Sequence, residues 1–238
     1  MKTDQFSQHI SRTFNEELEK LRNEVLSMGG MVENQLHTAV EAIVAGDSEL
    51  GLHVAGKDHE INQMEVAIDE ECSRILAIRG PAAADLRLIV AVIKTITDLE
   101  RVGDEAQKIG YLASKLASDQ QLHDHYHELS KLGEHVQTML HDALDAFSRL
   151  DVKDALLVVE EDKLVDEEYD MILRNCISMM MEDSRTIRRF MDMSWVARAL
   201  ERIGDHAKNI AEYVIYMVHG RDIRHLELEE VRQEVGAD

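Results

Sequence analysis

The sequence has few of the residues that interrupt helices or favour strands. Its 238 residues include one proline, and only 4% of them are aromatic. Proline breaks helices and aromatic residues are enriched in strands, so a chain of this length with so few of both is unlike a β-sheet protein. Hydrophobic residues still make up 45% of the chain, with 12 methionines. We therefore expect an all-α protein with an aliphatic, methionine-rich core.

Long apolar runs are also absent. No uninterrupted apolar stretch of about 18 residues occurs, and no charged-then-apolar leader opens the chain. Neither membrane spanning nor secretion is therefore indicated, and we expect a cytoplasmic protein. Cys72 and Cys176 are the only cysteines. We interpret them as reduced core thiols, with a redox pair or a thiolate metal ligand as the alternative.

Basic residues are outnumbered. The chain has 47 acidic and 26 basic residues, which gives a formal net charge of −21. Such a charge argues against binding to nucleic acid phosphates or to an anionic lipid surface. Cations are the natural small partners of such a protein.

An acidic motif occurs twice. Residues 100–104 read Glu-Arg-Val-Gly-Asp, and residues 201–205 read Glu-Arg-Ile-Gly-Asp. Upstream, His37 matches His141 at an offset of 104 residues, as other pairs do. The chain therefore contains an internal duplication.

Hydrophobic periodicity predicts helices over residues 6–45 and 49–78, and a third that ends near residue 116. The second half repeats this pattern, so we expect six long helices in two tandem three-helix bundles related by a pseudo-two-fold axis. The expected segments are a first repeat, a polar linker, a second repeat and an acidic tail that frays: residues 1–117, 118–129, 130–220 and 221–238. Three alternating histidines in the linker leave a metal-binding tract as its alternative.

The repeated carboxylates predict two cation sites. A short turn makes the second and third helices of each repeat antiparallel, so residues equally far from the turn lie at one height. The first site then contains Asp58, Asn62, Glu100 and Asp104, and the second contains Asp162, Asp166, Glu201 and Asp205. Helical angles place the Glu100 and Asp104 carboxylates on an outer flank of their helix, away from the core.

Oxygen ligands suit Mg²⁺ and Mn²⁺, and carboxylates also bind Fe and Zn. Asn62 contributes a neutral oxygen where the second site has Asp166, so the second site should bind cations more tightly. His206 is a further candidate ligand beside Asp205.

Other interpretations of these carboxylates stay open. A solvated acidic face balanced by Arg101, Arg198 and Arg202 would need no metal, which leaves a ligand-free helical scaffold. A carboxylate-bridged metal enzyme, such as an iron oxidase, is a third possibility. Di-iron bundles use a Glu-x-x-His element, and neither repeat has one beside its acidic pair.

These motifs resemble those of the PhoU family over essentially the whole chain. The resemblance rests on the acidic pairs Glu100–Asp104, Glu201–Asp205 and Asp162–Asp166, with Asp58–Asn62 as the counterpart of the last. Further runs that support it are 64–70, 85–88 and 181–187.

The resemblance implies a non-enzymatic, cytoplasmic negative regulator of phosphate uptake and of the phosphate-starvation response. It implies an adaptor between the ATPase subunit of a phosphate ABC transporter and a sensor histidine kinase, peripheral to the membrane through these partners only. It also implies a homodimer whose acidic motifs bind multinuclear metal clusters. Asn62 departs from the acidic pattern and weakens the first site.

Overall fold

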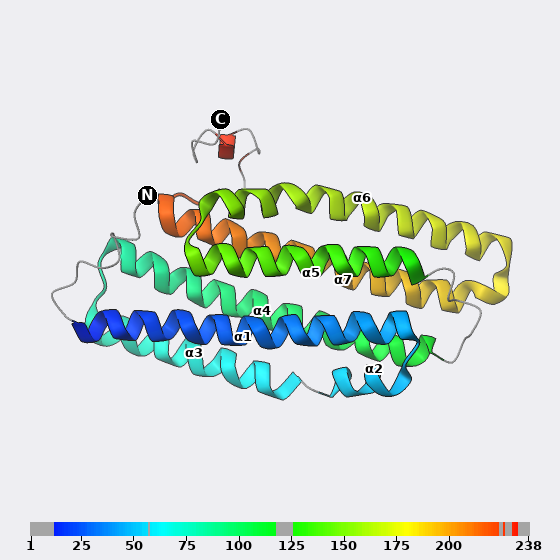
Figure 1. Cartoon of the computed structure of the whole chain (residues 1–238), viewed down its shortest axis with the longest axis horizontal. Coiled ribbons are helices and arrows are strands. Elements are labelled where there is room, and N and C mark those ends of the chain that lie inside the picture. Colours follow the sequence, from blue (N-terminus) through cyan, green and yellow to red (C-terminus); the bar gives the residue numbers. More distant parts are fainter. Residues whose placement is uncertain (1–11, 57, 118–125, 224–225, 227–229, 233–238) are drawn as a thin grey trace.

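The computed structural model describes residues 12–56, 58–117, 126–223, 226 and 230–232. Within these residues the protein consists of helices and their connections, with no strand (Figure 1). In chain order the helices are α1 (Arg12–Ala45), α2 (Ser48–Ala55), α3 (Asp58–Arg79), α4 (Ala83–Leu116), α5 (Tyr126–Arg149), α6 (Val152–Glu182), the short 3₁₀ helix η3 (Ser184–Thr186) and α7 (Ile187–His219). The expected all-α fold is confirmed.

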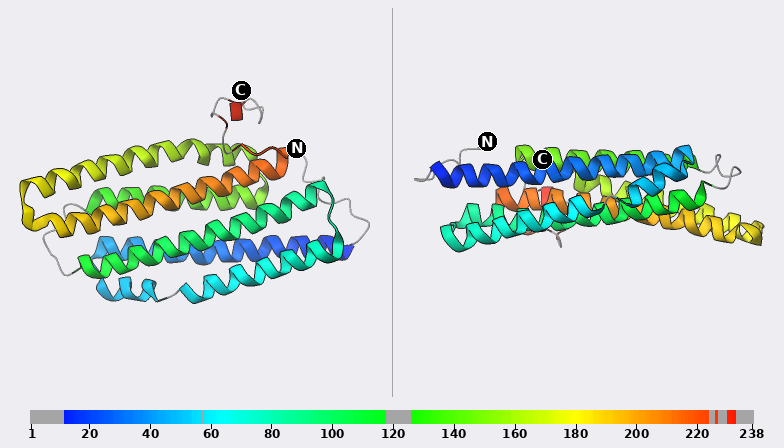
Figure 2. Two further views of the ribbon diagram at one scale, coloured as in Figure 1. Left: turned by 180° about the vertical axis from the view of Figure 1, so that it is seen from behind. Right: turned by 90° about the horizontal axis from the view of Figure 1, so that it is seen from below.

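Helices α1 to α4 form the first repeat, and α5 to α7 form the second. Figures 1 and 2 show the repeats side by side, with α4 and α7 adjacent along the middle of the molecule. Helices α1 and α5 also pack against each other. One continuous aliphatic core therefore runs through both repeats.

Reciprocal contacts between α1 and α5 show the pseudo-two-fold relation. A Cβ atom on Gly29 would lie 2.8 Å from Leu144 Cδ2, and one on Gly133 would lie 2.8 Å from Val40 Cγ1. Gly29 corresponds to Gly133 and Val40 corresponds to Leu144 in the duplication, so each contact is the counterpart of the other. Both glycines therefore allow a closer approach of the helices than any other residue would.

A second reciprocal pair lies on the same two helices. His37 Nδ1 lies 2.9 Å from Gln137 Oε1, and His141 Nδ1 lies 2.9 Å from Glu33 Oε1. The hydrogen bond with the Glu33 carboxylate raises the pKa of His141. Both repeats therefore contribute a histidine to an equivalent hydrogen bond, but only His141 has a charged partner, Glu33.

Matching caps begin the second helical segment of each repeat. Asp47 accepts hydrogen bonds from the backbone N–H groups of Glu49 and Leu50, and Asp151 accepts them from Lys153 and Asp154. Such N-caps satisfy backbone donors that have no partner within the helix.

The helix expected over residues 49–78 is broken into α2 and α3, whereas its counterpart α6 is continuous. Gly56 caps α2 where the second repeat has Glu160, a better helix former. Close packing holds α2 against α4, because a Cβ atom on Gly51 would lie only 2.6 Å from Gly110 O. The Gln107 side chain also donates to Ala55 O at 2.9 Å.

One predicted boundary and the predicted fraying of the tail differ from the structure. Helix α5 begins at Tyr126, inside the expected linker, because Tyr126 and Leu129 are buried. Residues 118–125, which include His123 and His125, lie outside the described residues. The described part of the tail is also packed rather than frayed, since Ile223 and Val231 are buried.

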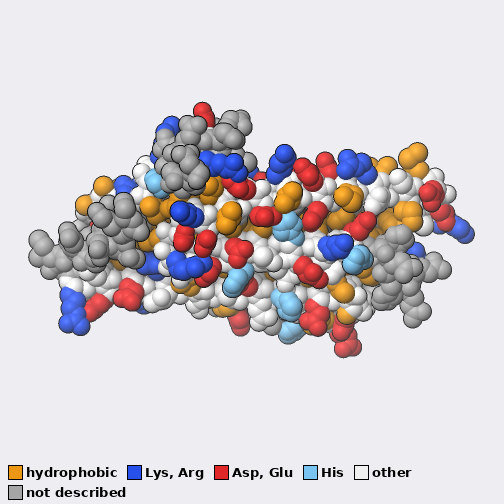
Figure 3. Space-filling view, turned by 45° about the horizontal axis from the view of Figure 1, so that its top comes forward, with side chains coloured by type: hydrophobic (Ala, Val, Ile, Leu, Met, Phe, Trp, Pro, Cys, Tyr) orange, Lys and Arg blue, Asp and Glu red, His pale blue; other side chains and the backbone are white. Residues whose placement is uncertain are grey.

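Both cysteines are free and buried, as predicted. Burial raises the pKa of the Cys72 thiol to about 12 and that of Cys176 to about 11. No described helix has a stretch long and apolar enough to cross a bilayer. Figure 3 shows acidic side chains distributed along one face of the molecule, interspersed with basic and apolar ones.

Candidate metal centre

The four residues of the second predicted site lie where α6 and α7 pack together. Asp162 and Asp166 come from α6, and Glu201 and Asp205 come from α7. The predicted antiparallel register is confirmed by two neighbouring contacts. A Cβ atom on Gly204 would lie 3.1 Å from Val165 Cγ1, and the Arg198 guanidinium lies 5.7 Å from the centroid of the Tyr169 ring.

Burial and mutual repulsion act on the carboxylates of this second site. Burial, followed by the charge of Asp205, raises the pKa of Glu201 to about 7. The pKa of Asp205 is raised by burial and then by Asp162 and Asp166. The pKa of Asp166 is raised by burial and then by Asp162. These carboxylates therefore lie close enough to repel one another.

Two cations partly neutralise the second site. Lys208 Nζ lies 2.6 Å from Asp162 Oδ2, and an Arg198 guanidinium nitrogen lies 2.5 Å from Glu201 Oε1. The other carboxylate oxygen of Glu201 is buried and has no hydrogen-bond partner in the structure. An additional cation would satisfy this oxygen.

The four carboxylates of the second site differ in exposure. Asp162 and Glu201 are each only 7% exposed, whereas Asp166 and Asp205 are exposed. Asp162 pairs with Lys208 and Glu201 pairs with Arg198, so both buried carboxylates have a cationic partner. The site thus has a buried half and an exposed half.

The first site joins α3 and α4. Asn62 is on α3, and Glu100 and Asp104 are on α4, all partly buried. Arg101 lies 3.4 Å from a carboxylate oxygen of each acidic residue. Asp58 is the first residue of α3, and its side chain is outside the described residues.

Glu65 belongs to this surface and was not predicted. Burial raises its pKa, and the charges of Asp69 and Asp104 raise it further, while Arg101 lowers it. Glu65 and Asp69 form an acidic pair with the same four-residue spacing as the predicted pairs. This four-residue spacing is the sequence signal by which Glu65 could have been predicted.

His206 faces the first repeat. Its Nδ1 lies 2.7 Å from Asp98 Oδ1 on α4, and Asn209 donates to the same oxygen at 3.0 Å. Arg202 likewise pairs with Glu105 of α4 at 2.6 Å, rather than with the carboxylates of the second site. Both side chains therefore join the repeats.

Over residues 12–56, 58–117 and 126–223, no three His, Cys, Asp or Glu side chains are placed together as a metal ion requires. The donor chemistry of the second site fits a hard cation, since it offers four carboxylates and one buried oxygen without a partner. Metal binding stays a prediction.

Comparisons with known proteins agree on one family. The sequence model of the PhoU domain matches twice, at residues 25–113 and 129–214. The phosphate-specific transport system accessory protein PhoU homolog of Pseudomonas aeruginosa is 50% identical over 232 residues, which cover 98% of this chain and 96% of that protein. The phosphate-specific transport system accessory protein PhoU of Escherichia coli strain K12 is 49% identical over 220 residues, covering 92% and 91%.

Solved structures agree as well. The crystal structure of PhoU from Pseudomonas aeruginosa superposes with a TM-score of 0.85 at 51% identity, covering 87% of this chain and all of that one. The phosphate transport system regulatory protein PhoU from Streptococcus pneumoniae gives a TM-score of 0.82 at 29% identity, covering 88% and 98%. The chain therefore belongs to the PhoU family.

Proposed function

We propose that this protein is a non-enzymatic accessory protein of a phosphate transport system. In this role it limits phosphate uptake and keeps the phosphate-starvation response off when phosphate is plentiful. The observation that carries the proposal is the match to the Pseudomonas aeruginosa accessory protein, at 50% identity over nearly the full length of both chains.

The proposed mode of action is that of an adaptor. As a cytoplasmic homodimer, the protein docks the ATPase subunit of the phosphate ABC transporter and a sensor histidine kinase. Exposed apolar side chains on α6 support a docking role. Leu157, Leu164 and Met171 recur every seven residues and are 59%, 47% and 53% exposed. Such a stripe on one helix face is a typical contact surface for another protein.

Complementation tests the regulatory role. The chain is expressed in Escherichia coli that lacks its own PhoU, during growth in excess phosphate, with an alkaline phosphatase reporter of the starvation response. We expect the reporter to be repressed to the level seen with the native protein. A reporter that stays active, with the chain present in normal amounts, would refute the proposal. Separately, oxygen consumption by iron-loaded protein would indicate an oxidase instead.

We further propose that the acidic clusters bind metal ions such as Mg²⁺, Mn²⁺, Fe or Zn. Asp162, Asp166, Glu201 and Asp205 would hold the tighter site, and Asp58, Asn62, Glu100 and Asp104 the weaker one. A bound cation supplies positive charge that offsets the repulsion evident in the raised pKa values of three second-site carboxylates. Asp162 of α6 pairs with Lys208 of α7 and so links the two helices, whereas Glu201 pairs with Arg198 within α7.

Elemental analysis of untagged protein tests the metal proposal. The quadruple alanine variant of the second site should lose most of its bound metal. The control variant replaces four exposed glutamates with alanine and changes the net charge equally: Glu19, Glu70, Glu167 and Glu182. Equal metal content in the wild type and the second-site variant would contradict the assignment.

A further inference from the structure

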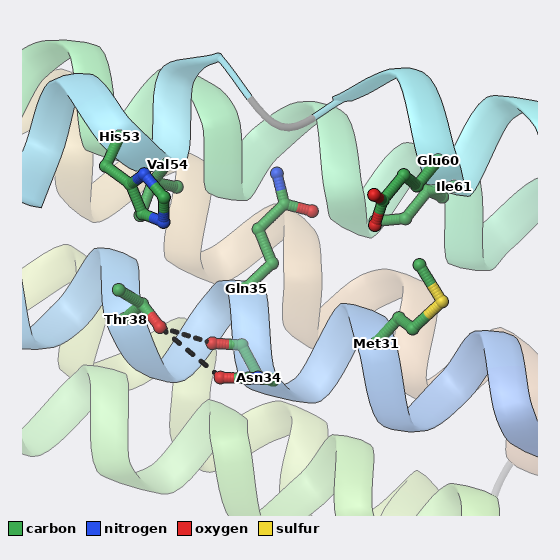
Figure 4. Close-up of a pocket in the computed structure, with 8 residues that line it drawn as sticks. All are labelled: Met31, Asn34, Gln35, Thr38, His53, Val54, Glu60 and Ile61. Atoms are coloured by element: carbon green, nitrogen blue, oxygen red, sulfur yellow. Dashed lines mark hydrogen bonds between the residues drawn. The ribbon is translucent and has the colours of Figure 1, made fainter.

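A cavity of about 100 Å³ lies between α1 and the break that separates α2 from α3 (Figure 4). The polar part of its lining is formed by Asn34, Gln35, Thr38, His53 and Glu60. Met31, Val54 and Ile61 add apolar surface. Its lining does not include the first-site residues Asn62, Glu100 and Asp104.

Gln35 is the central residue of this cavity. Its side chain is 94% buried, since its exposure is 6%, yet neither Nε2 nor Oε1 has a hydrogen-bond partner in the structure. Figure 4 shows the carboxamide directed from α1 toward the connection between α2 and α3. The His53 ring lies on one side of it and the Glu60 carboxylate on the other. Buried amide groups are almost always hydrogen-bonded, so this carboxamide requires a partner.

The second repeat shows that the fold does not require these polar residues. At an offset of 104 residues, Met139 replaces Gln35 and Leu157 replaces His53. These two residues line the equivalent hollow between α5 and α6, where α6 is continuous. The second hollow also contains an imidazole, that of His135, so it is the buried amide that is specific to the first repeat, where the helix is broken.

The carboxamide restricts the chemistry of a partner. A cation would pair with Oε1 and leave the Nε2 donors unsatisfied. An anion would pair with Nε2 alone and would lie beside Glu60 in a protein of net charge −21. A group that presents a donor next to an acceptor pairs with both atoms at once, as amides and the adenine edge do.

The size of the cavity limits the ligand further. Water occupies about 30 Å³ per molecule, so the volume corresponds to roughly three waters or one compact organic group. We propose that the first repeat binds a small uncharged molecule with a primary amide edge. Gln35 forms two hydrogen bonds to that edge, Glu60 accepts from a remaining N–H, and the apolar wall contacts the carbon skeleton.

Three isosteric probes of four heavy atoms each test this proposal. Acetamide has a donor and an acceptor, acetone has an acceptor only, and acetate is an anion. Each is titrated into the ¹⁵N-labelled full-length protein while the side-chain NH₂ signals of Gln35 are followed by NMR. For four heavy atoms the Kd can be no tighter than about 40 µM, so the titrations extend through the millimolar range.

We expect acetamide alone to shift the Gln35 signals saturably. The Gln35→Met variant, which copies Met139 of the second repeat, should keep its fold and lose the acetamide-dependent shifts in neighbouring backbone signals. His53→Leu copies Leu157 and should weaken binding at least several-fold. The control Gln63→Met alters an exposed glutamine of α3 and should bind as the wild type does.

Three outcomes would overturn the proposal. They are an unsaturated response to acetamide, equal shifts with acetone or acetate, and unchanged binding in Gln35→Met. Any of them would mean that buried water alone satisfies the carboxamide.

Discussion

Two adjacent glycines in α1 should respond oppositely to the same substitution. Gly29 faces α5, and a Cβ atom there would lie 2.8 and 2.9 Å from the two methyl carbons of Leu144. Gly30 is exposed, and a Cβ atom there would meet no atom within 4 Å. Both residues lie inside the same helix, so their backbone contributions are alike. The pair therefore isolates the effect of close packing between the repeats.

The magnitudes follow from two effects. Replacing glycine by alanine inside a helix stabilises it by about 1 kcal/mol. Adding a methyl group to a filled core costs about 1–3 kcal/mol. Gly30→Ala should thus raise the free energy of unfolding by about 1 kcal/mol. The free energy of unfolding of Gly29→Ala should be about 1–3 kcal/mol lower than that of Gly30→Ala, because the buried Leu144 side chain must move.

Urea unfolding followed by circular dichroism at 222 nm measures these differences. Leu144→Ala in the Gly29→Ala background serves as the rescue variant, since it removes the two methyl carbons that the new Cβ atom meets. The alanine at residue 29 should cost less in that background than in the wild type. If both glycine variants are stabilised equally, the close approach of α1 to α5 described above is wrong.

Two further predictions concern charge. The Glu33 hydrogen bond raises the pKa of His141, so this pair stabilises the fold at pH values below the pKa of the unfolded imidazole, and the contribution is lost as the pH rises through the raised pKa. Glu33→Gln should therefore lower the pKa of His141 in an NMR titration. An unchanged pKa would contradict this. Lys208→Met should lower the free energy of unfolding, because the mostly buried Asp162 loses its partner. The loss should be only roughly 1–3 kcal/mol, since the Lys208 side chain is 33% exposed and water screens the pair. Mn²⁺ should restore part of that loss in thermal melts, and substitution of the exposed Lys163 by Met is the control.

The register of each helix pair could be predicted because it depends on local patterns alone. Helical periodicity and a short turn are enough to bring residues 58–62 alongside 100–104 and residues 162–166 alongside 201–205. In the structure Gly103 lies by Ile61 and Gly204 by Val165, close to that register. Each glycine admits an aliphatic side chain from the neighbouring helix. Gly103 and Gly204 therefore allow close helix packing.

The break at Gly56 and the burial of Glu201 were missed for different reasons. Periodicity is nearly unchanged across Gly56, because α3 resumes almost in line with α2, and only the glycine itself signalled the break. Whether Glu201 is buried depends on Arg198 and on the facing helix α6. Such burial depends on tertiary packing, so it cannot be predicted from the positions of residues around α7 alone.

The contacts of α4 with α7 determine which halves can assemble. Asp98 pairs with His206 and Arg202 pairs with Glu105, but the duplication aligns His206 with Glu105. If two copies of the first repeat packed together, Glu105 would take the place of His206 and two acidic residues, Asp98 and Glu105, would meet. If two copies of the second repeat packed together, His206 would take the place of Glu105 and would meet Arg202. Each half pairs well only with the other. At these two contacts the halves of the chain are therefore complementary to each other rather than interchangeable.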